Sequence, residues 1–191
     1  MKIVEIELTQ GKVAIIDEAD VELVGQYKWH AVKRDRTWYA ATSAERRRGR
    51  SIYMHRLIAG ESKHVDHRNH DGLNNTRKNL RVCTNQQNRH NTQKTRGEAK
   101  YKGVSRDKRQ PGRPWAAYIW NDNRKISLGS YPTQEEAARA YNAAAIQYHG
   151  EFANLNSIEG MTYDESVIAP DRNRRSGRIR KRARPVAGPV D

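Results

Sequence analysis

Apolar and polar residues alternate over residues 2–16, on both sides of a Gln-Gly pair at residues 10 and 11. A period of two predicts strands, and the central Gly predicts a tight turn, so this segment is expected to form a hairpin. Apolar residues then recur with helical spacing at Val21, Val24 and Tyr27. They predict a short amphipathic helix, capped at its start by Asp17.

Two further strands are predicted over residues 29–43 and 51–54, separated by a polar, Arg-rich turn at residues 45–50. Residues 1–51 are therefore expected to form a small N-terminal α+β segment.

The next pattern predicts two short strands and a helix. The strands cover residues 64–67 and 80–83, and Thr84 is placed to cap a helix over residues 85–92. Asp-Gly and Asn-Asn pairs between the strands favour turns. Together they predict a ββα hairpin-plus-helix.

Residues 93–100 are polar except for Ala99 and resemble a linker. Three strand-like segments follow within residues 101–130. A helix is predicted over residues 133–150, with Thr133 as its N-cap, Glu136 completing a capping box, and Gly150 at its end.

Strand alternation assigns two faces to this second sheet. Trp115, Ala117 and Ile119 fall on one face, which is expected to pack against an Ala-rich stripe of the helix, whereas Tyr118 and Trp120 fall on the other. The next strand repeats the pattern, with Ile126 and Leu128 inward and Lys125 and Ser127 outward. An open face with aromatic and basic side chains suits a DNA groove. The alternatives are a dimer interface or an unpaired aromatic residue on a sheet edge.

The charge of the chain points to a polyanionic partner. There are 36 Lys and Arg against 22 Asp and Glu, a net charge of +14, although residues 1–30 are themselves acidic. Nucleic acid is the leading candidate. Only 36% of residues are hydrophobic, which favours small domains over one large core. Residues 158–191 lose periodicity and become Arg-rich, so a disordered basic tail is expected there.

A single cysteine, Cys83, excludes an intrachain disulfide and a zinc finger built on paired cysteines. No stretch resembles a signal peptide or a membrane span. The expectation is a soluble protein of a reducing compartment that is not secreted and has no membrane partner.

The ββα segment carries a candidate catalytic set. Phosphodiester hydrolysis requires a nucleophilic water, a base and positive charge at the phosphate. Asp66 and Asn88 offer hard oxygen ligands for Mg²⁺ or Mn²⁺, and His67 is the candidate general base. Asn79 is placed either to tie the long loop to the His67 backbone or to orient the imidazole.

This pattern resembles the HNH (His-Asn-His, ββα-metal) nucleases, in particular the phage-type homing endonucleases. The resemblance covers residues 52–92 and includes a Met-His-Arg-Leu lead-in at residues 54–57. It implies that Asp66 is a metal ligand, His67 the base and Asn79 a support, with Asn88 in place of the final His as the second metal ligand. The cysteine pairs of some relatives are missing. The resemblance also implies a location in the cytoplasm of a bacterium or of a phage-infected host.

The plain alternative is that Asp66 and His67 belong to a hydrogen-bonded turn without chemistry. His64, His70 and His90 are interpreted as solvated or phosphate-facing. Four arginines of this region are interpreted as surface charges rather than clamps: Arg68, Arg77, Arg81 and Arg89.

Residues 101–157 resemble the Apetala-two/ethylene-response-factor DNA-binding domain. The resemblance rests on Tyr-Lys-Gly-Val at residue 101, Trp-Ala-Ala-Tyr-Ile at 115, Leu-Gly-Ser-Tyr at 128, Glu-Glu-Ala-Ala-Arg-Ala-Tyr at 135 and Ala-Asn-Leu-Asn at 153. It implies DNA contacts by Lys102, Ser105, Tyr118, Trp120, Lys125 and Ser127, to which Arg106 and Arg124 are added as basic neighbours. The loop at residues 107–114 departs from the family, so its target sequence is not carried over.

The chain is thus expected to be an α+β protein with a segment at 1–51, a nuclease domain at 52–92, a linker at 93–100, a DNA-binding domain at 101–157 and a tail at 158–191. The predicted function is a metal-dependent homing-type endonuclease, monomeric on double-stranded DNA, that nicks it to leave a 5′ phosphate. A noncatalytic DNA-binding regulator is the alternative. An RNA-binding protein is less favoured, because few aromatic residues form a single-strand platform.

Overall fold

The computed structural model describes residues 2–34, 37–43, 51–60, 64–93 and 97–160. Helices and strands are mixed, and every sheet is antiparallel, so the α+β prediction is confirmed. The predicted basic turn at 45–50 and nearly all of the predicted tail lie outside these residues. Among the described helices, none is long and apolar enough to cross a membrane.

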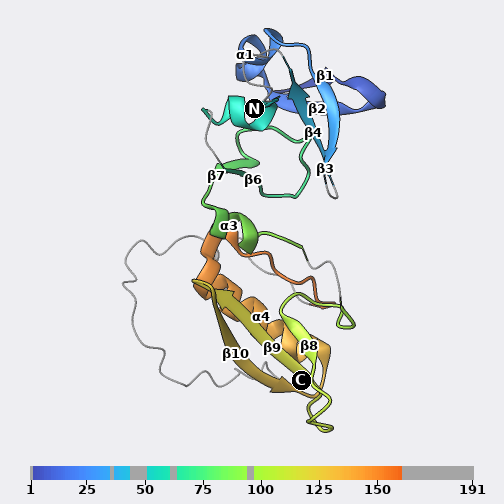
Figure 1. Ribbon diagram of the computed structural model, residues 1–191, viewed down its shortest axis with the longest axis vertical. Helices are drawn as coiled ribbons and strands as arrows, with labels where there is room; N and C mark the ends of the chain where they lie inside the picture. The colour runs from blue at the N-terminus through green and yellow to red at the C-terminus, as the bar shows by residue number, and fades with distance from the viewer. Residues whose placement is uncertain (1, 35–36, 44–50, 61–63, 94–96, 161–191) are drawn as a thin grey trace, which may run out of the picture.

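We refer to residues 2–93 as the N-terminal unit (Figure 1). Its elements are β1 (Ile3–Glu7), η1 (Thr9–Gly11), β2 (Val13–Asp17), η2 (Glu18–Asp20), α1 (Val21–Gly25), β3 (His30–Arg34), β4 (Thr37–Thr42), β5 (Ile52–Tyr53), α2 (Met54–Ile58), β6 (Val65–His67), β7 (Leu80–Val82) and α3 (Asn85–His90). The predicted hairpin is β1 with β2, and the sheet β3-β4-β5 and the hairpin β6-β7 follow it. One hydrophobic core joins them, from Leu8 to Leu80. The predicted boundary after residue 51 therefore falls inside a single packed unit.

The long loop between β6 and β7 is held against β2 and η2. Ile15 donates its amide to the Leu73 carbonyl and accepts from the Asn75 amide. Arg77 forms an ion pair with Asp20 at 2.6 Å, and its amide donates to Asp17 Oδ2 at 2.7 Å. The predicted capping role of Asp17 is wrong, because its carboxylate accepts from this distant loop instead of from the helix that follows it.

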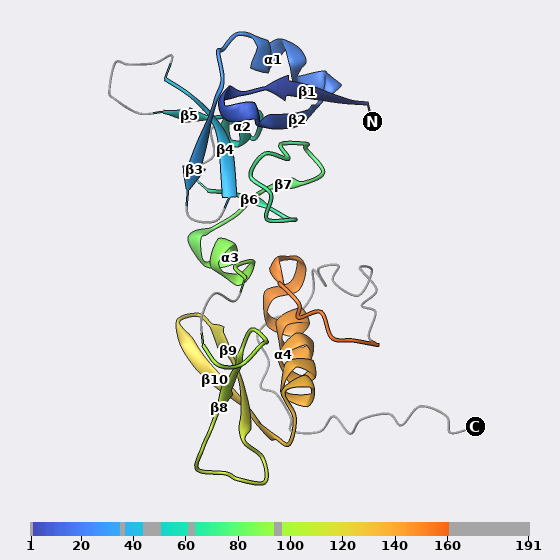
Figure 2. The ribbon, with the colours of Figure 1, turned by 90° about the vertical axis from the view of Figure 1, so that its right-hand side faces the viewer.

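We refer to residues 97–160 as the C-terminal unit. It contains β8 (Val104–Arg106), β9 (Trp115–Asn121), β10 (Arg124–Tyr131), α4 (Gln134–His149) and η4 (Gly150–Phe152). The sheet order is β10-β9-β8, and α4 lies along one face of it (Figure 2). Ala99, predicted to lie in a linker, is buried in this core.

Small side chains allow α4 to approach the sheet closely. Ala117 on β9 packs with Ala137 and Ala138 of α4, and Ile119 packs with Tyr141 and Ala145. The predicted helix-facing positions of the strand are confirmed. Thr133 caps α4 by accepting from the Glu136 amide, and Gly150 ends it with φ 52°.

Candidate nuclease cleft and DNA-reading sheet

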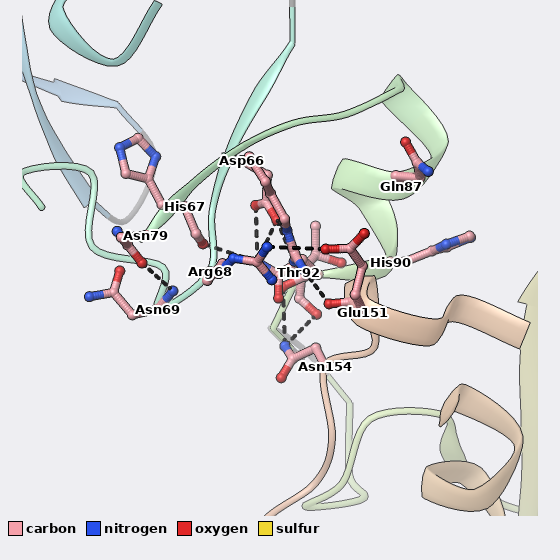
Figure 3. Close-up of polar contacts among 12 residues, drawn as sticks. Asp66, His67, Arg68, Asn69, Asn79, Gln87, His90, Thr92, Glu151 and Asn154 are labelled. Atoms are coloured by element: carbon pink, nitrogen blue, oxygen red, sulfur yellow. Dashed lines mark hydrogen bonds and ion pairs between the residues drawn. The ribbon is translucent and has the colours of Figure 1, made fainter. Parts of the chain in front are cut away.

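A cleft of about 880 Å³ opens where β6, the following loop and α3 meet. Asp66, His67 and Asn88, three of the predicted site residues, all line it. The cleft is further lined by Arg34, Thr37, Tyr39, Val65, Asn69, His70, Asp71, Asn91, Thr92 and Gln93. Asp66 and His67 are both buried, and their side chains leave β6 on opposite sides (Figure 3), as strand alternation requires.

The Asp66 carboxylate is held by two polar side chains. Arg81 lies opposite Asp66 in the antiparallel register and donates from Nε and Nη2 to Oδ2, at 2.7 and 2.6 Å. Asn91 Nδ2 donates to Oδ1 at 2.9 Å and to Oδ2 at 3.0 Å. These donors fix the orientation of the carboxylate, and the hydrogen bonds from the charged guanidinium are of the stronger kind.

Arg81 is itself buried, so its interpretation as a surface charge is wrong. Its guanidinium lies 4.0 Å from the centre of the Phe152 ring, and Nη1 donates to the Glu151 carbonyl. Both partners belong to the C-terminal unit. The pairing of Asp66 with Arg81 follows from the hairpin register, which was the signal for it in the sequence.

His67 is oriented by Asn75, which sequence reasoning missed. Asn75 is fully buried and donates Nδ2 to the Leu73 carbonyl, so its Oδ1 faces His67 Nε2 at 3.3 Å. This network assigns the proton of the neutral ring to Nε2, because Oδ1 only accepts. Nδ1 is then the nitrogen able to take a proton.

Burial keeps the His67 ring neutral by lowering its pKa, against smaller opposing effects of Asn75 and Asp66. The His55 ring lies beside the His67 ring, with 5.0 Å between their centres. The Tyr39 ring is also close, with its centre 5.7 Å from that of His67. Burial lowers the pKa of His55 to about 3, so it adds no positive charge next to His67 near neutral pH. His55 was not among the predicted site residues, although it lies in the Met-His-Arg-Leu lead-in.

Asn79 ties the loop rather than the imidazole. Its Oδ1 accepts from the Asn69 amide at 3.1 Å, and its Nδ2 donates to the Asn74 carbonyl at 2.7 Å. Its carbonyl also accepts from the Arg68 amide at 3.0 Å. Neither of the two roles considered from the sequence is seen as stated. Asn79 ties the loop to the backbone of Arg68 and Asn69, next to His67, and Asn75 contacts the imidazole.

Asn88 lies one turn into α3, whose start is fixed by the capping box of Thr84 and Gln87, as the predicted N-cap requires. The donor chemistry of the cleft fits a hard cation. Asp66 Oδ1 accepts one hydrogen bond among the described residues, which leaves lone-pair capacity, and Asn88 can add an amide oxygen. Within the described residues no group of three or more His, Cys, Asp or Glu side chains is arranged to hold a metal ion. A cation would therefore depend on this two-residue pair, with the remaining positions taken by phosphate and water.

The open face of the C-terminal sheet collects five of the predicted DNA-contacting residues. Register pairs Lys125 with Trp120, Ser127 with Tyr118, and Ser105 with Ala116, which shares their face. Trp120 is 54% exposed, and Lys125 Nζ lies 4.0 Å from the centre of the Tyr118 ring. A positive, aromatic face thus stands on the side of the sheet away from α4.

The other three predicted contacts are placed differently. Arg124 pairs in register with Asn121 and Arg106 with Trp115, both on the helix-facing side, and Arg106 forms an exposed ion pair with Glu98 at 2.6 Å. Lys102 reaches the N-terminal unit, donating to the carbonyls of His90 and Thr92 at 2.5 and 2.6 Å.

This architecture defines a class of protein in which a ββα hairpin with an Asp-His cleft is joined to a three-stranded sheet packed on one helix. Residues 99–151 match the AP2 domain family, so the C-terminal unit contains an AP2 domain. The chain is also similar to an uncharacterized HNH endonuclease of Acanthamoeba polyphaga mimivirus, with 28% identity over 155 residues, 78% of each chain. The resemblances to HNH endonucleases and to AP2 domains are confirmed.

Plant proteins match a smaller part of the chain. An ethylene-responsive transcription factor of Arabidopsis thaliana is 46% identical over 55 residues, 28% of this chain and 33% of its own. An AP2/ERF and B3 domain-containing protein of Oryza sativa subsp. japonica is 41% identical over 58 residues, 30% of this chain and 15% of its own. Each of these two similarities therefore covers less than a third of this chain and no more than about a third of the plant protein.

Proposed function

We propose that the protein is a metal-dependent endonuclease of double-stranded DNA, in which the N-terminal unit cuts and the AP2 domain locates the site. One observation carries the proposal: a neutral, oriented imidazole and a fixed carboxylate line the same cleft, beside an AP2 domain. Similarity to an HNH endonuclease along 78% of the chain supports it.

The residues of the cleft divide the chemistry between them. His67 Nδ1 takes a proton from a water molecule as that water attacks phosphorus, while Asn75 holds the opposite edge of the ring. The bond from phosphorus to the 3′ oxygen breaks and that oxygen takes up a proton from solvent, leaving a 5′ phosphate and a 3′ hydroxyl. Because one such cleft exists per chain among the described residues, a monomer would nick one strand.

Asp66 and Asn88 would hold Mg²⁺ or Mn²⁺. When bound, the cation supplies positive charge to the scissile phosphate and to the leaving oxygen. Arg81 and Asn91 hold the Asp66 carboxylate in place, so that one of its oxygen atoms is positioned for a hard cation. A homing role, in which the enzyme cuts near its own gene, belongs to the same proposal.

Supercoiled plasmid cleavage tests the proposal. We expect the wild type to convert supercoiled to open-circular DNA with Mg²⁺ or Mn²⁺ and to stop on addition of EDTA. His67→Ala should lower the rate by about 10²–10⁴-fold, the usual contribution of a general base, with unchanged DNA binding. His30→Ala, at a half-buried histidine of the same unit that does not line the cleft, is the matched control and should cleave normally.

Binding without cleavage by the wild type, under any divalent metal, would overturn the nuclease assignment in favour of a noncatalytic DNA-binding regulator. Stronger binding to RNA than to duplex DNA in a competition assay would contradict the choice of substrate.

A further inference from the structure

The two units meet at the C-terminal end of α3, which lies between the β6-β7 hairpin and α4 in Figure 2. Helix ends leave carbonyls without helical partners. Here, the C-terminal unit supplies the missing donors. Lys102 Nζ donates to the carbonyls of His90 and Thr92, and Asn154 Nδ2 donates to those of Asn91 and Thr92, at 3.2 and 3.0 Å.

The Lys102 ammonium group contacts the carbonyls of this junction and is largely removed from solvent. Desolvation lowers the pKa of its ammonium group to about 8. The helix carbonyls offset the cost of burying this charge, since the negative end of a helix favours a cation. A lysine serving mainly as a free phosphate contact would not need to be partly buried against these carbonyls.

The backbone of Lys102 is anchored to α4 through two asparagines. Asn156 accepts from the Lys102 amide at 2.7 Å and donates to its carbonyl at 3.0 Å. Asn142, a buried residue of α4, exchanges two hydrogen bonds with the Asn156 backbone, at 2.8 and 2.9 Å. An unbroken series of polar contacts therefore runs from α4 to the end of α3.

Contacts around this junction oppose a hinge motion. His90 of α3 stacks on His149 of α4, with 3.6 Å between ring centres and 9° between ring planes. Arg81 contacts Glu151 and Phe152, and Gln86 donates to Asp122 at 2.9 Å. These contacts come from several elements of each unit, which restrains rotation as well as separation.

The junction also lies between the two candidate DNA surfaces. Thr92 and Gln93 line the nuclease cleft and also a second pocket, of about 420 Å³, whose walls include Tyr118 and Trp120. The carbonyl held by both Lys102 and Asn154 is that of Thr92. Movement at Thr92 would change the position of the open sheet face relative to the nuclease cleft.

We propose that Lys102 and Asn154 are specificity-determining residues that clamp the AP2 domain to the nuclease cleft, so that the cut falls at one fixed distance from the sequence read. The consequence for cutting rests on the proposed function, whereas the clamp is a property of the protein without DNA.

Distances between spin labels test the clamp directly. In a Cys83→Ser background, Lys78→Cys and Arg113→Cys place one label on an exposed residue of each unit. We expect a single narrow distance distribution for the full chain, which broadens in Lys102→Met with Asn154→Ala. Lys100→Met, an exposed lysine two residues before Lys102, removes the same charge and should leave the distribution narrow. A distribution that is broad in every protein, or one unchanged by the double variant, would overturn the clamp.

Mapping of cut positions tests the consequence. Duplexes selected from a random-sequence pool by binding to His67→Ala are end-labelled and cut with the active proteins. The wild type and Lys100→Met should give one cut position, and the double variant should lose that single position and scatter its cuts while still binding the same duplexes. Unscattered cuts by the double variant would overturn the proposed specificity role. No cleavage by the wild type would sink the proposed function alone, because the label distances still decide whether the clamp exists.

Discussion

The N-terminal unit keeps most of its candidate functional side chains inside, with Asn88 exposed on α3, whereas the C-terminal unit displays its own on the open face of a sheet. Asp66, His67, Asn75 and Arg81 are all buried and bonded to one another or to the backbone. Trp120, in contrast, is more than half exposed. A buried polar group is costly unless its partners are in place, and an exposed one is not. Substitutions in the cleft of the N-terminal unit should therefore lower folding stability, whereas substitutions on the open face of the C-terminal sheet should not.

Arg81→Met gives the largest expected effect and tests this expectation. The substitution leaves the buried Asp66 carboxylate without its guanidinium partner. Breaking a buried ion pair lowers the free energy of unfolding by about 3–5 kcal/mol. Urea unfolding of the full chain measures the free energy of unfolding. Adding Asp66→Leu to Arg81→Met should recover much of the loss, because an apolar pair needs no compensation.

Arg68→Met is the matched control, since Arg68 also pairs with a carboxylate, that of Glu151, but both side chains are substantially exposed. Its cost should stay within about 1 kcal/mol. Equal losses in Arg68→Met and Arg81→Met would show that burial does not separate the two sites.

Gly103→Ala tests whether the close packing of α4 on the sheet stabilises the C-terminal unit. Gly103 has φ +72°, and a Cβ at this position would overlap the Tyr141 ring and stand 2.7 Å from the Tyr118 carbonyl oxygen. Overpacking combined with a strained backbone should cost about 1–3 kcal/mol, measured by thermal unfolding.

Gly112→Ala provides the comparison for Gly103→Ala. Gly112 has no positive φ, and an added Cβ there meets nothing within 4 Å. Its melting temperature should not fall. If both variants melt like the wild type, the close approach of α4 to the sheet is not what stabilises the C-terminal unit.

The same contrast explains what the sequence could predict. In the C-terminal unit, strand parity alone separated the core positions Ala117 and Ile119 from the exposed Trp120, because a face covered by one helix has a period of two. Tyr118 lies on the same open face as Trp120. The ββα elements and the Thr84 cap were equally predictable, since each is a local signal.

The polar interior of the N-terminal unit was not predictable in the same way. Asp17 bonds the backbone of Arg77, 60 positions along the chain, instead of capping its own helix. Asn75 was indistinguishable from its Asn neighbours until the loop was seen to pair with β2. Lys102 was assigned to DNA from a family resemblance, whereas its contacts cross to the other unit. Side chains of this kind acquire their roles from long-range packing, which no local pattern records.

Lys125→Met is expected to have the smallest effect, and it tests whether the open face is free of structural duties. The Lys125 ammonium lies over the Tyr118 ring on an exposed sheet face, where such a contact contributes only about 0.5–1 kcal/mol. Unfolding should therefore change little, whereas DNA affinity should fall at every salt concentration.

Fluorescence anisotropy titrations at several salt concentrations check this for a duplex bound by the wild type. If Lys125 contacts one phosphate, the slope of log affinity against log salt should become shallower by about 0.9, the value for one released counterion. Lys108→Met removes the same charge from an exposed residue outside the open face and should leave the slope unchanged. An unchanged slope in Lys125→Met would contradict a DNA contact by this face. The exposed Lys125, which lies beside two aromatic rings, would then have neither a structural nor a binding role.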